Sequence, residues 1–213
     1  MVSAADRPDA ADLRRALDVS LERLTALPDR AWDCTAADLA WTCRETAAHV
    51  LGVLGGYALQ LAGTGERFHP YPPLAEHHPH PDRPGVWFWP VEAGGTRAIV
   101  QCLDDVGGLL VAVVATVPPD RTGQHPSGAS DRTGFAAMGM GEVLLHTHDI
   151  LTAHDASPHM ADDVVSPVLS RILPDAARRT DAWGDLLRAT GRTEETRGRR
   201  WQWDPARRTR ARR

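Results

Sequence analysis

A glutamate and a histidine one helical turn apart are the residues of this chain best suited to chemistry. Glu142 and His146 lie in the segment GMGEVLLHTHDI, where most of their neighbours are apolar. Residues at positions i and i+4 stack on one face of a helix, so a carboxylate oxygen and an imidazole nitrogen can converge on one point. A carboxylate is costly to bury among apolar side chains unless it is paired or binds a metal. The pair therefore indicates a metal site or a buried ion pair.

A metal site needs a third ligand, because a catalytic zinc ion usually has three protein ligands and one open position. His49 is the best candidate, since it lies in the apolar helical segment CRETAAHVLGVLGGYALQ, as a facing helix of a bundle would supply it. Asp149 falls on the same side of its helix as Glu142 and His146 and is the candidate catalytic residue, which steadies the site or contacts a substrate. The structural alternative is that Glu142 pairs with a buried Arg and that both histidines are core residues.

The composition indicates a globular protein with one domain and at most a small appendage. The chain has 213 residues, 42% of them hydrophobic, and a formal net charge of -4. From Arg197 to Arg213 there are eight Arg and one acid, so the basic character belongs to a terminal tail. A short tail without a folded basic face is more typical of a solvated terminus than of a nucleic-acid site.

The three cysteines and the N-terminus indicate a reducing compartment. Cys34, Cys43 and Cys102 form neither a CxxC pair nor an even set, so we interpret them as packing residues in the cytoplasm. The segment MVSAADRPDAADLRR is acidic and polar where a signal peptide would be basic and then apolar, and no uninterrupted apolar run reaches about 18 residues. We therefore expect a cytoplasmic protein without a membrane or nucleic-acid partner. The sequence does not indicate an oligomeric state.

Apolar periodicity predicts four long helices. Leucines at positions 13, 17, 21 and 24 indicate the first helix, which Pro28 ends, and Thr42 and Glu45 form a capping box at the start of the second. The third helix is the apolar run between Gly95 and Pro118, which we expect to be central. A polar linker over 120–131 then leads to the fourth helix, which carries the Glu-His pair.

The remaining segments are shorter or irregular. Residues 63–92 contain prolines, four histidines and no helical period, so we expect a long loop with a short extended piece at VWFWPV. Its histidines His77, His78 and His80 alternate with prolines and are interpreted as exposed or as lining a pocket mouth. Two short helical patterns follow Pro158.

The predicted fold class is therefore all-α. A metal-binding four-helix bundle is expected over residues 1–160, and accessory C-terminal helices with the Arg-rich tail are expected over 161–213.

Two motifs resemble a known family. The segment from Trp41 to Leu54, with Trp-Thr-Cys-Arg-Glu before Ala-Ala-His, resembles the second-helix motif of DinB-like metal-binding bundles, in the branch of mycothiol-dependent maleylpyruvate isomerases. The segment 141–150 resembles the fourth helix of that branch, in which a Glu, a His four residues later and a nearby Asp complete a metal site with the earlier His. The stretches ARRTDAWGDLLRATGR and RRWQW are similar to the end of many members. The resemblance implies the metal ligands His49, Glu142 and His146.

The resemblance also implies a function. It points to a metal-dependent transferase or isomerase with mycothiol as cosubstrate and a small electrophile as substrate. Zinc best matches one carboxylate and two imidazoles, although nickel, manganese and iron also accept such ligands. A thiol bound at the open position would lose its proton and attack an electrophilic carbon.

One departure from the family and two other functions bear on this expectation. The full isomerases carry an additional C-terminal domain that contributes to their active site, and the given sequence is too short to hold it. The resemblance therefore implies a metal site and thiol transfer more directly than isomerisation. A non-catalytic metal-binding or sensing bundle and a hydrolase with metal-activated water stay open as alternatives.

Overall fold

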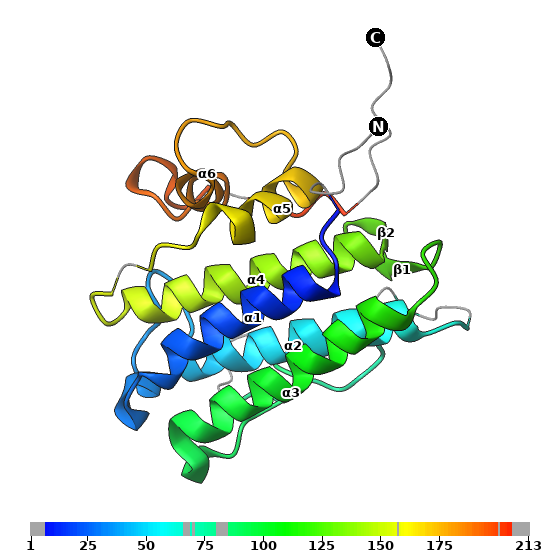
Figure 1. Cartoon of the computed structure of the whole chain (residues 1–213). Coiled ribbons are helices and arrows are strands. Elements are labelled where there is room, and N and C mark those ends of the chain that lie inside the picture. The colour runs from blue at the N-terminus through cyan, green and yellow to red at the C-terminus, as the bar shows by residue number, and fades with distance from the viewer. Residues whose placement is uncertain are drawn as a thin grey trace.

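The four long helices lie side by side as a bundle, and a layer of shorter helices packs on one of them (Figure 1). The computed structural model describes residues 7–65, 69, 71–79, 85–156, 158–199 and 201–205. The bundle helices are α1 (Ala10–Thr25), α2 (Cys43–Ala62), α3 (Gly95–Thr116) and α4 (Arg132–Thr152). The outer layer contains α5 (Asp162–Ile172), which packs on α4, and α6 (Ala182–Ala189), which packs on α5. The all-α prediction is confirmed.

Side chains cap the helices that carry the candidate ligands. The Thr42 hydroxyl accepts a hydrogen bond from the backbone N–H of Glu45 at 3.2 Å, and the Glu45 carboxylate accepts one from the N–H of Thr42 at 2.7 Å. This is the capping box predicted from the sequence. At the start of α4, the carboxylate of Asp131 accepts hydrogen bonds from the N–H groups of Thr133 and Gly134 at 3.0 and 3.1 Å.

The expected polar linker at 120–131 is instead a β-hairpin, so that prediction was wrong. Strand β1 (Thr122–His125) pairs antiparallel with β2 (Gly128–Asp131), and His125 faces Gly128 at the turn. Gly128 has a φ of 129°, a conformation that glycine adopts far more readily than other residues. Each strand has four residues without apolar alternation, which is why the sequence pattern did not reveal them.

The central helix of the bundle is α4. The expectation that the third helix, α3, would be central was therefore wrong. Every residue from Gly134 to Leu151 is buried, because α1, α2 and α5 all pack against α4. Helix α3 buries one face, formed by residues 99, 103, 107, 110 and 114, whereas Leu109 on its other side is 51% exposed. Hydrophobic content indicated a bundle helix, but it did not indicate how many neighbours would cover that helix.

The apolar composition of α3 also bears on whether this helix could cross a membrane. By length and composition alone, Glu92–Thr116 would suit a membrane-spanning helix. In the structure 28% of the apolar window of this helix is buried, and α3 packs along α1 and α2 with Asp104 and Asp105 exposed.

Part of the segment 63–92 lies against α2. His77 and Val86 form an isolated antiparallel bridge, so of the extended piece expected at VWFWPV only Val86 pairs with another segment of the described chain. A Cβ atom at Gly56 would lie 2.7 Å from the indole of Trp87, so the glycine allows that indole to approach α2 closely. The third histidine of the proline-rich run, His80, lies outside the described residues.

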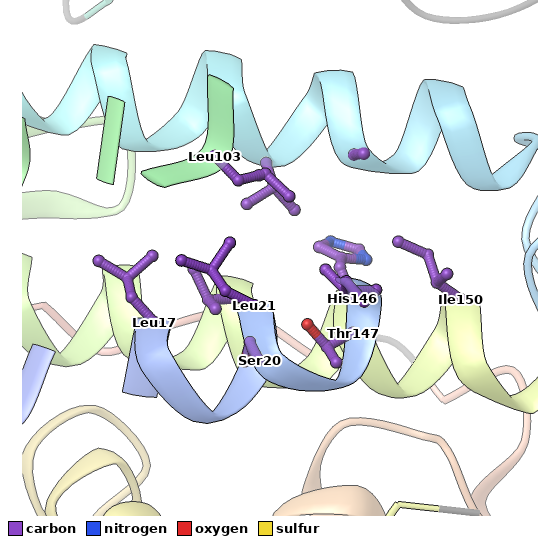
Figure 2. Close-up of a pocket in the computed structure, with 11 residues that line it drawn as sticks. Leu17, Ser20, Leu21, Leu103, His146, Thr147 and Ile150 are labelled. Atoms are coloured by element: carbon purple, nitrogen blue, oxygen red, sulfur yellow. The ribbon is translucent and has the colours of Figure 1, made fainter. Parts of the chain in front are cut away.

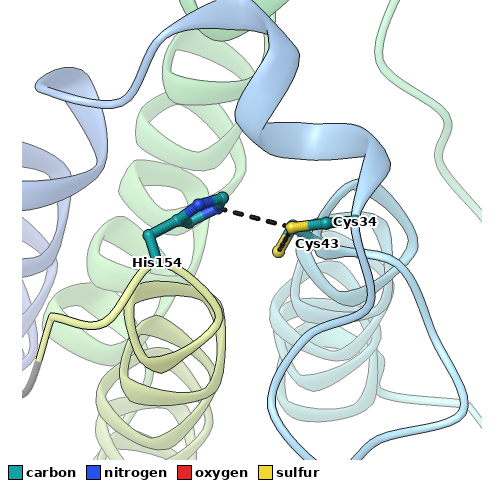
Figure 3. Close-up of side chains that lie close together, drawn as sticks. All are labelled: Cys34, Cys43 and His154. Carbon is teal, nitrogen blue, oxygen red and sulfur yellow. Dashed lines mark hydrogen bonds between the residues drawn. The ribbon is translucent and has the colours of Figure 1, made fainter.

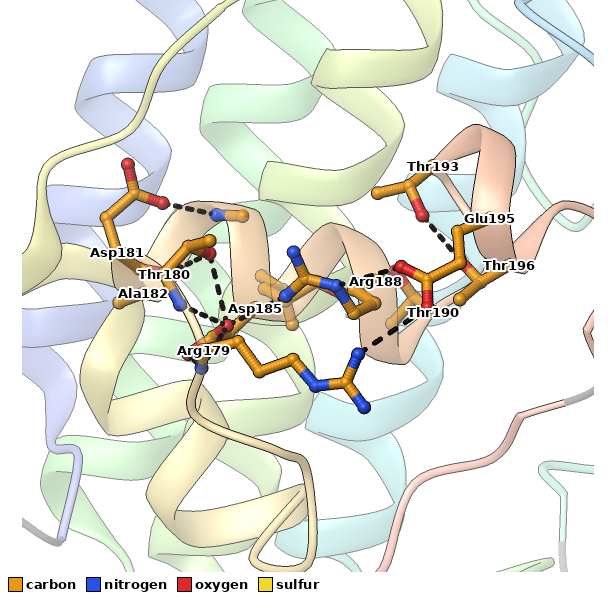
Figure 4. Close-up of polar contacts among 12 residues, drawn as sticks. Arg179, Thr180, Asp181, Ala182, Asp185, Arg188, Thr190, Thr193, Glu195 and Thr196 are labelled. Atoms are coloured by element: carbon orange, nitrogen blue, oxygen red, sulfur yellow. Dashed lines mark hydrogen bonds and ion pairs between the residues drawn. The ribbon is translucent and has the colours of Figure 1, made fainter.

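A polar network anchors the outer layer (Figure 4). The carboxylate of Asp185 on α6 is 2% exposed and accepts hydrogen bonds from the backbone N–H groups of Arg179 and Thr180 at 3.0 and 3.1 Å. Arg188, one turn further on α6, forms an ion pair with the same carboxylate at 2.9 Å. These contacts fix the loop that precedes α6. After α6 the chain continues back toward α4.

Candidate metal centre

Three side chains from two helices converge at the middle of the bundle. His49 comes from α2, and Glu142 and His146 come from α4. Nε2 of His146 lies 3.4 Å from Oε2 of Glu142, and Nε2 of His49 lies 3.8 Å from the same oxygen. One possible ligand atom from each residue lies within 4.8 Å of the other two. The structure thus brings together the three residues that the sequence analysis named as ligands.

The carboxylate of Glu142 is buried and has polar partners beside both oxygens. The indole N–H of Trp203 donates to Oε1 at 2.7 Å, while the two imidazoles lie beside Oε2. Burial by itself raises the pKa of Glu142, but the contacts with His146 and His49 outweigh burial and hold that pKa well below its usual range. Within the described part of the chain Glu142 forms no ion pair with an Arg, so the expected structural alternative lacks its partner.

Asp149 holds the ring of His146 from behind. Nδ1 of His146 donates to Oδ2 of Asp149 at 3.0 Å, because an ionised carboxylate only accepts hydrogen bonds. Arg192 binds both oxygens of Asp149, with Nε at 2.8 Å from Oδ1 and Nη2 at 2.7 Å from Oδ2. This arrangement leaves Nε2 of His146 directed toward Glu142 and available to a metal.

The charges around His146 shift its pKa and that of Asp149 in opposite directions. Burial alone lowers the pKa of His146, but hydrogen bonds to Asp149 and Glu142 and their negative charges raise it to about 9. Burial alone raises the pKa of Asp149, but hydrogen bonds from His146 and Arg192 and their positive charges lower it to about 2. The carboxylates of Glu142 and Asp149 carry two negative charges, and Arg192 supplies one positive charge. Without a metal, a proton on His146 supplies the second.

The three donors fit a zinc-class cation. Bonds of about 2.0 to 2.1 Å to nitrogen and oxygen at a tetrahedral angle place neighbouring donors about 3.3 Å apart. The distance of 3.4 Å between His146 and Glu142 matches that value, and the distance of 3.8 Å between His49 and Glu142 is wider by about half an ångström. Two imidazoles and one carboxylate form a common donor set of catalytic zinc sites, and the Asp149 contact gives His146 the partner that ligating imidazoles need.

The candidate centre lies at one wall of a cavity of about 720 Å³. His49 and Glu142 both line this cavity, and Gly52 and Gly56 extend its floor along α2. Aromatic and apolar side chains from the segment 63–92 form the opposite wall. The cavity lining includes Trp41, Tyr57, Tyr71, Leu74, Val86, Trp87 and Trp203. A volume of this size suits a small-molecule ligand.

Polar groups lie among these apolar walls. His125, from the hairpin, is 8% exposed, and burial lowers its pKa. Its Nδ1 accepts a hydrogen bond from the N–H of Ser127 at 3.1 Å, so the neutral ring carries its proton on Nε2. Gln60 and His69 also line the cavity. These groups give the cavity hydrogen-bonding capacity that the apolar walls lack.

The other side of His146 is closely packed. Figure 2 shows His146 and Ile150 of α4 facing Leu21 of α1 and Leu103 of α3 around a gap of about 10 Å³. A gap of that volume holds about one water molecule at most. Access to the candidate centre is therefore from the large cavity.

Several contributors to this site had no predicted role. The ring of Trp41 lies against that of His49, tilted by 38° with ring centroids 4.6 Å apart. Arg192 and Trp203 reach α4 from the C-terminal segment. Arg192 ends the stretch ARRTDAWGDLLRATGR and Trp203 ends RRWQW, and the sequence analysis gave both stretches only as similarities to the family, without a role for either residue. His148 does point away from the site, toward Trp183 of α6, with ring centroids 5.6 Å apart.

The loop histidines are separate from the centre. Nε2 of His78 lies 3.8 Å from Oε2 of Glu76 at the surface, and His77 pairs with Val86 through its backbone. Among the described residues, neither His77 nor His78 belongs to a group of converging metal ligands.

The fold and this arrangement define a helical bundle with a His-Glu-His centre in its middle. The family model of the DinB superfamily matches residues 12–150, and the chain belongs to that superfamily. The match includes His49, Glu142, His146 and Asp149, whereas Arg192 and Trp203 lie beyond it. It identifies the superfamily and does not distinguish the maleylpyruvate isomerase branch. No curated protein and no solved structure matches the chain.

Proposed function

We propose that the protein is a metal-dependent enzyme that uses a low-molecular-weight thiol, of the mycothiol class, to transform a small electrophile. The observation that carries this proposal is the convergence of His49, Glu142 and His146 at the wall of a cavity large enough for a small molecule. We propose zinc as the metal, with these three residues as its ligands. A thiol bound to such an ion is deprotonated near neutral pH.

The positions of the cysteines support a thiol that comes from outside the chain. None of Cys34, Cys43 and Cys102 lines the cavity, so a sulfur nucleophile there would have to be a cosubstrate. The resemblance of the two ligand helices to the maleylpyruvate isomerase branch favours mycothiol over other small thiols. The same ligands would also serve a hydrolase, and we distinguish the two by experiment.

The surrounding residues would each have a part in this reaction. Asp149 and Arg192 would hold the ring of His146 in the orientation that a ligand needs, with Nε2 toward the metal. Trp41 and Trp87 would exclude water from the reacting atoms, and the imidazole of His125 would hydrogen-bond polar groups of the substrate.

The metal assignment is tested with His49→Ala and His146→Ala variants purified without a His tag. We expect each variant to bind one metal ion per chain fewer than the wild type, because loss of one of three ligands opens the site. His159→Ala is the matched control, since His159 also pairs with a carboxylate, that of Asp181 at 3.0 Å, but on the surface. Equal metal content in all four proteins would end the assignment.

The reaction is tested with metal-loaded protein and a panel of electrophiles, with and without mycothiol. Conversion of an electrophile that depends on the protein, the metal and mycothiol is the expected result, with free thiol consumed by a transferase and regenerated by an isomerase. Turnover without any thiol would identify a metal-dependent hydrolase instead. If the loaded protein transforms no substrate under either condition, the site belongs to a binding or sensing module.

A further inference from the structure

A second group of metal-binding side chains lies near one end of the α2–α4 pair (Figure 3). Cys34 lies in the connector between α1 and α2, just after the short 3₁₀ helix Asp29–Asp33. Cys43 is the first residue of α2, and His154 follows α4 by two residues. One ligand atom from each lies within 4.8 Å of the others. Three segments that are distant in sequence therefore present two sulfurs and an imidazole to one point.

The two distances from Sγ of Cys34 match tetrahedral coordination, and Sγ of Cys43 and the ring nitrogen of His154 lie within 4.8 Å of each other. The two Sγ atoms are 3.7 Å apart, and Sγ of Cys34 is 3.6 Å from Nε2 of His154. Zinc bonds of about 2.3 Å to sulfur and about 2.0 to 2.1 Å to nitrogen, at a tetrahedral angle, place two sulfurs about 3.8 Å apart and sulfur about 3.6 Å from nitrogen. Both measured distances therefore agree with one ion bound between these atoms.

The backbone holds the two cysteines in this position. Thr35 and Thr42 form an antiparallel bridge, and the N–H of Cys43 donates to the carbonyl oxygen of Cys34 at 2.8 Å. Cys43 is fully buried, while Cys34 is partly buried. The thiols are thus set side by side by hydrogen bonds that do not depend on the sulfur atoms.

A fourth donor lies at the same point. The carbonyl oxygen of Ala31 is 3.0 Å from Nε2 of His154 and 3.3 Å from Sγ of Cys34. In the metal-free chain this oxygen accepts hydrogen bonds from both groups. When a cation displaces the Cys34 and Nε2 protons to solvent, this carbonyl oxygen would be placed to face the cation as a fourth ligand. Structural zinc sites usually have four protein ligands, and here the carbonyl oxygen of Ala31 would take the place of a fourth side chain.

We propose that Cys34, Cys43 and His154 bind a second divalent cation of the zinc class, in a structural role. This site is distinct from the His-Glu-His centre, since Cys43 lies about 9 Å before His49 on α2 and His154 lies beyond the end of α4, which is itself about 9 Å past His146, by the helical rise. Thiolates favour zinc over harder cations such as magnesium. The ion would tie the α1–α2 connector to both ligand-bearing helices.

The connector has a direct link to the first site. It ends at Trp41 and Thr42, and the indole of Trp41 lies against the imidazole of His49 with its ring tilted by 38°. The N–H of Ala36 donates to the carbonyl oxygen of Trp41 at 2.9 Å, close to the proposed cation. The second ion would therefore help to fix the indole that covers His49.

Cobalt substitution tests this proposal without any activity measurement. The full chain is reduced, stripped of metal and titrated with Co²⁺, and the thiolate-to-cobalt charge-transfer absorption in the near ultraviolet is recorded. We expect the wild type to bind two ions and to show this absorption, because one of the two ions would have sulfur ligands. His49→Ala should bind one ion fewer but keep the absorption. The test of the second site is therefore independent of whether the first site binds a metal.

Variants at the cluster complete the test. We expect Cys34→Ser and His154→Gln to bind one ion fewer and Cys34→Ser to lose most of the absorption, with unchanged helical circular dichroism. Cys102→Ser is the matched control, because Cys102 is a partly buried thiol on α3 outside the cluster. In the wild type, zinc should slow alkylation of Cys34 at least about tenfold and leave Cys102 unaffected.

Three results would overturn the proposal. The first is a wild-type chain that shows no thiolate absorption at saturating cobalt. The second is an absorption that survives in Cys34→Ser or disappears in Cys102→Ser. The third is a Cys34–Cys43 disulfide that persists in the purified protein under reducing conditions, since it would remove both sulfur ligands.

Discussion

Asp149 contacts His146 and Arg192 rather than the cavity. Its carboxylate receives three hydrogen bonds from these two side chains, and it is not among the residues that line the cavity. These contacts favour a positioning role for Asp149 over direct contact with a substrate. The carboxylate keeps Nδ1 of His146 protonated, and this leaves Nε2 free for a metal.

Asp149→Asn should therefore weaken metal binding without removing a ligand. The amide keeps the size of the side chain but loses the charge that orients His146 and pairs with Arg192. We expect the metal affinity to fall about 10- to 100-fold, measured by competition with a chromophoric chelator. Asp185→Asn is the control, since Asp185 is also buried and paired with an Arg, but on α6. Similar affinity losses in both variants would contradict the positioning role.

Metal binding should release a proton from His146. The pKa of this residue is about 9 without a metal, so the ring is charged at neutral pH, whereas a ligand must be neutral. We expect the apparent metal affinity to rise with pH up to about pH 9 and then to level off. Without a metal, the raised pKa contributes stability below about pH 6.5, and this contribution is lost as the pH rises through about 9.

Calorimetric titration of metal at neutral pH, in buffers of different ionisation enthalpy, measures this release. The Cys34→Ser chain is used so that thiol deprotonation at the second site does not contribute. Binding without proton release would show that His146 is neutral before the metal arrives.

The helices of this protein could be predicted because their signals are local. The capping box of Thr42 and Glu45 and the leucine spacing of α1 depend on residues within a few turns of each other. The convergence of His49 with the Glu142–His146 pair followed from helix periodicity together with family resemblance. The hairpin and the outer position of α3 could not be predicted, because they depend on what packs against each segment.

Two adjacent glycines on α3 test how the bundle helices pack. A Cβ at Gly107 would lie 2.6 and 2.8 Å from the methyl carbons of Leu17, which is buried in α1. A Cβ at Gly108 would meet nothing within 4 Å. We expect Gly108→Ala to stabilise the protein by about 0.5 to 1 kcal/mol, since alanine is the better helix former. Gly107→Ala should destabilise it by about 1 to 3 kcal/mol through overpacking.

Urea unfolding followed by circular dichroism measures both free energies. The two variants make the same chemical change one residue apart, so each serves as the control for the other. A stabilising effect of both substitutions would show that α3 is not packed against α1 at Gly107.

The C-terminal segment completes the centre at the scale of the whole molecule. Arg192 and Trp203 lie beyond the superfamily match, yet they hydrogen-bond Asp149 and Glu142 inside it. The hydroxyl of Ser130 donates to the carbonyl oxygen of Pro205 at 2.7 Å, which fixes the end of this segment to the hairpin. The paired residues are separated by 43 to 75 positions in the sequence, so no local sequence pattern could predict these pairings.

Trp203→Phe tests whether this segment is part of the site. The variant keeps an aromatic ring at the cavity wall but loses the N–H that binds Oε1 of Glu142, so a buried carboxylate loses a partner. We expect a loss of about 1.5 to 3 kcal/mol in the free energy of unfolding without metal, and a metal affinity at least about tenfold lower. Urea unfolding in a chelator and competition titration measure the two effects.

Trp89→Phe is the matched control, because the indole of Trp89 also donates to a glutamate, Glu92, but at 3.3 Å on the surface. That variant should change stability by no more than about 0.5 kcal/mol. Equal effects of the two substitutions would mean that the C-terminal segment covers the bundle without supporting the centre.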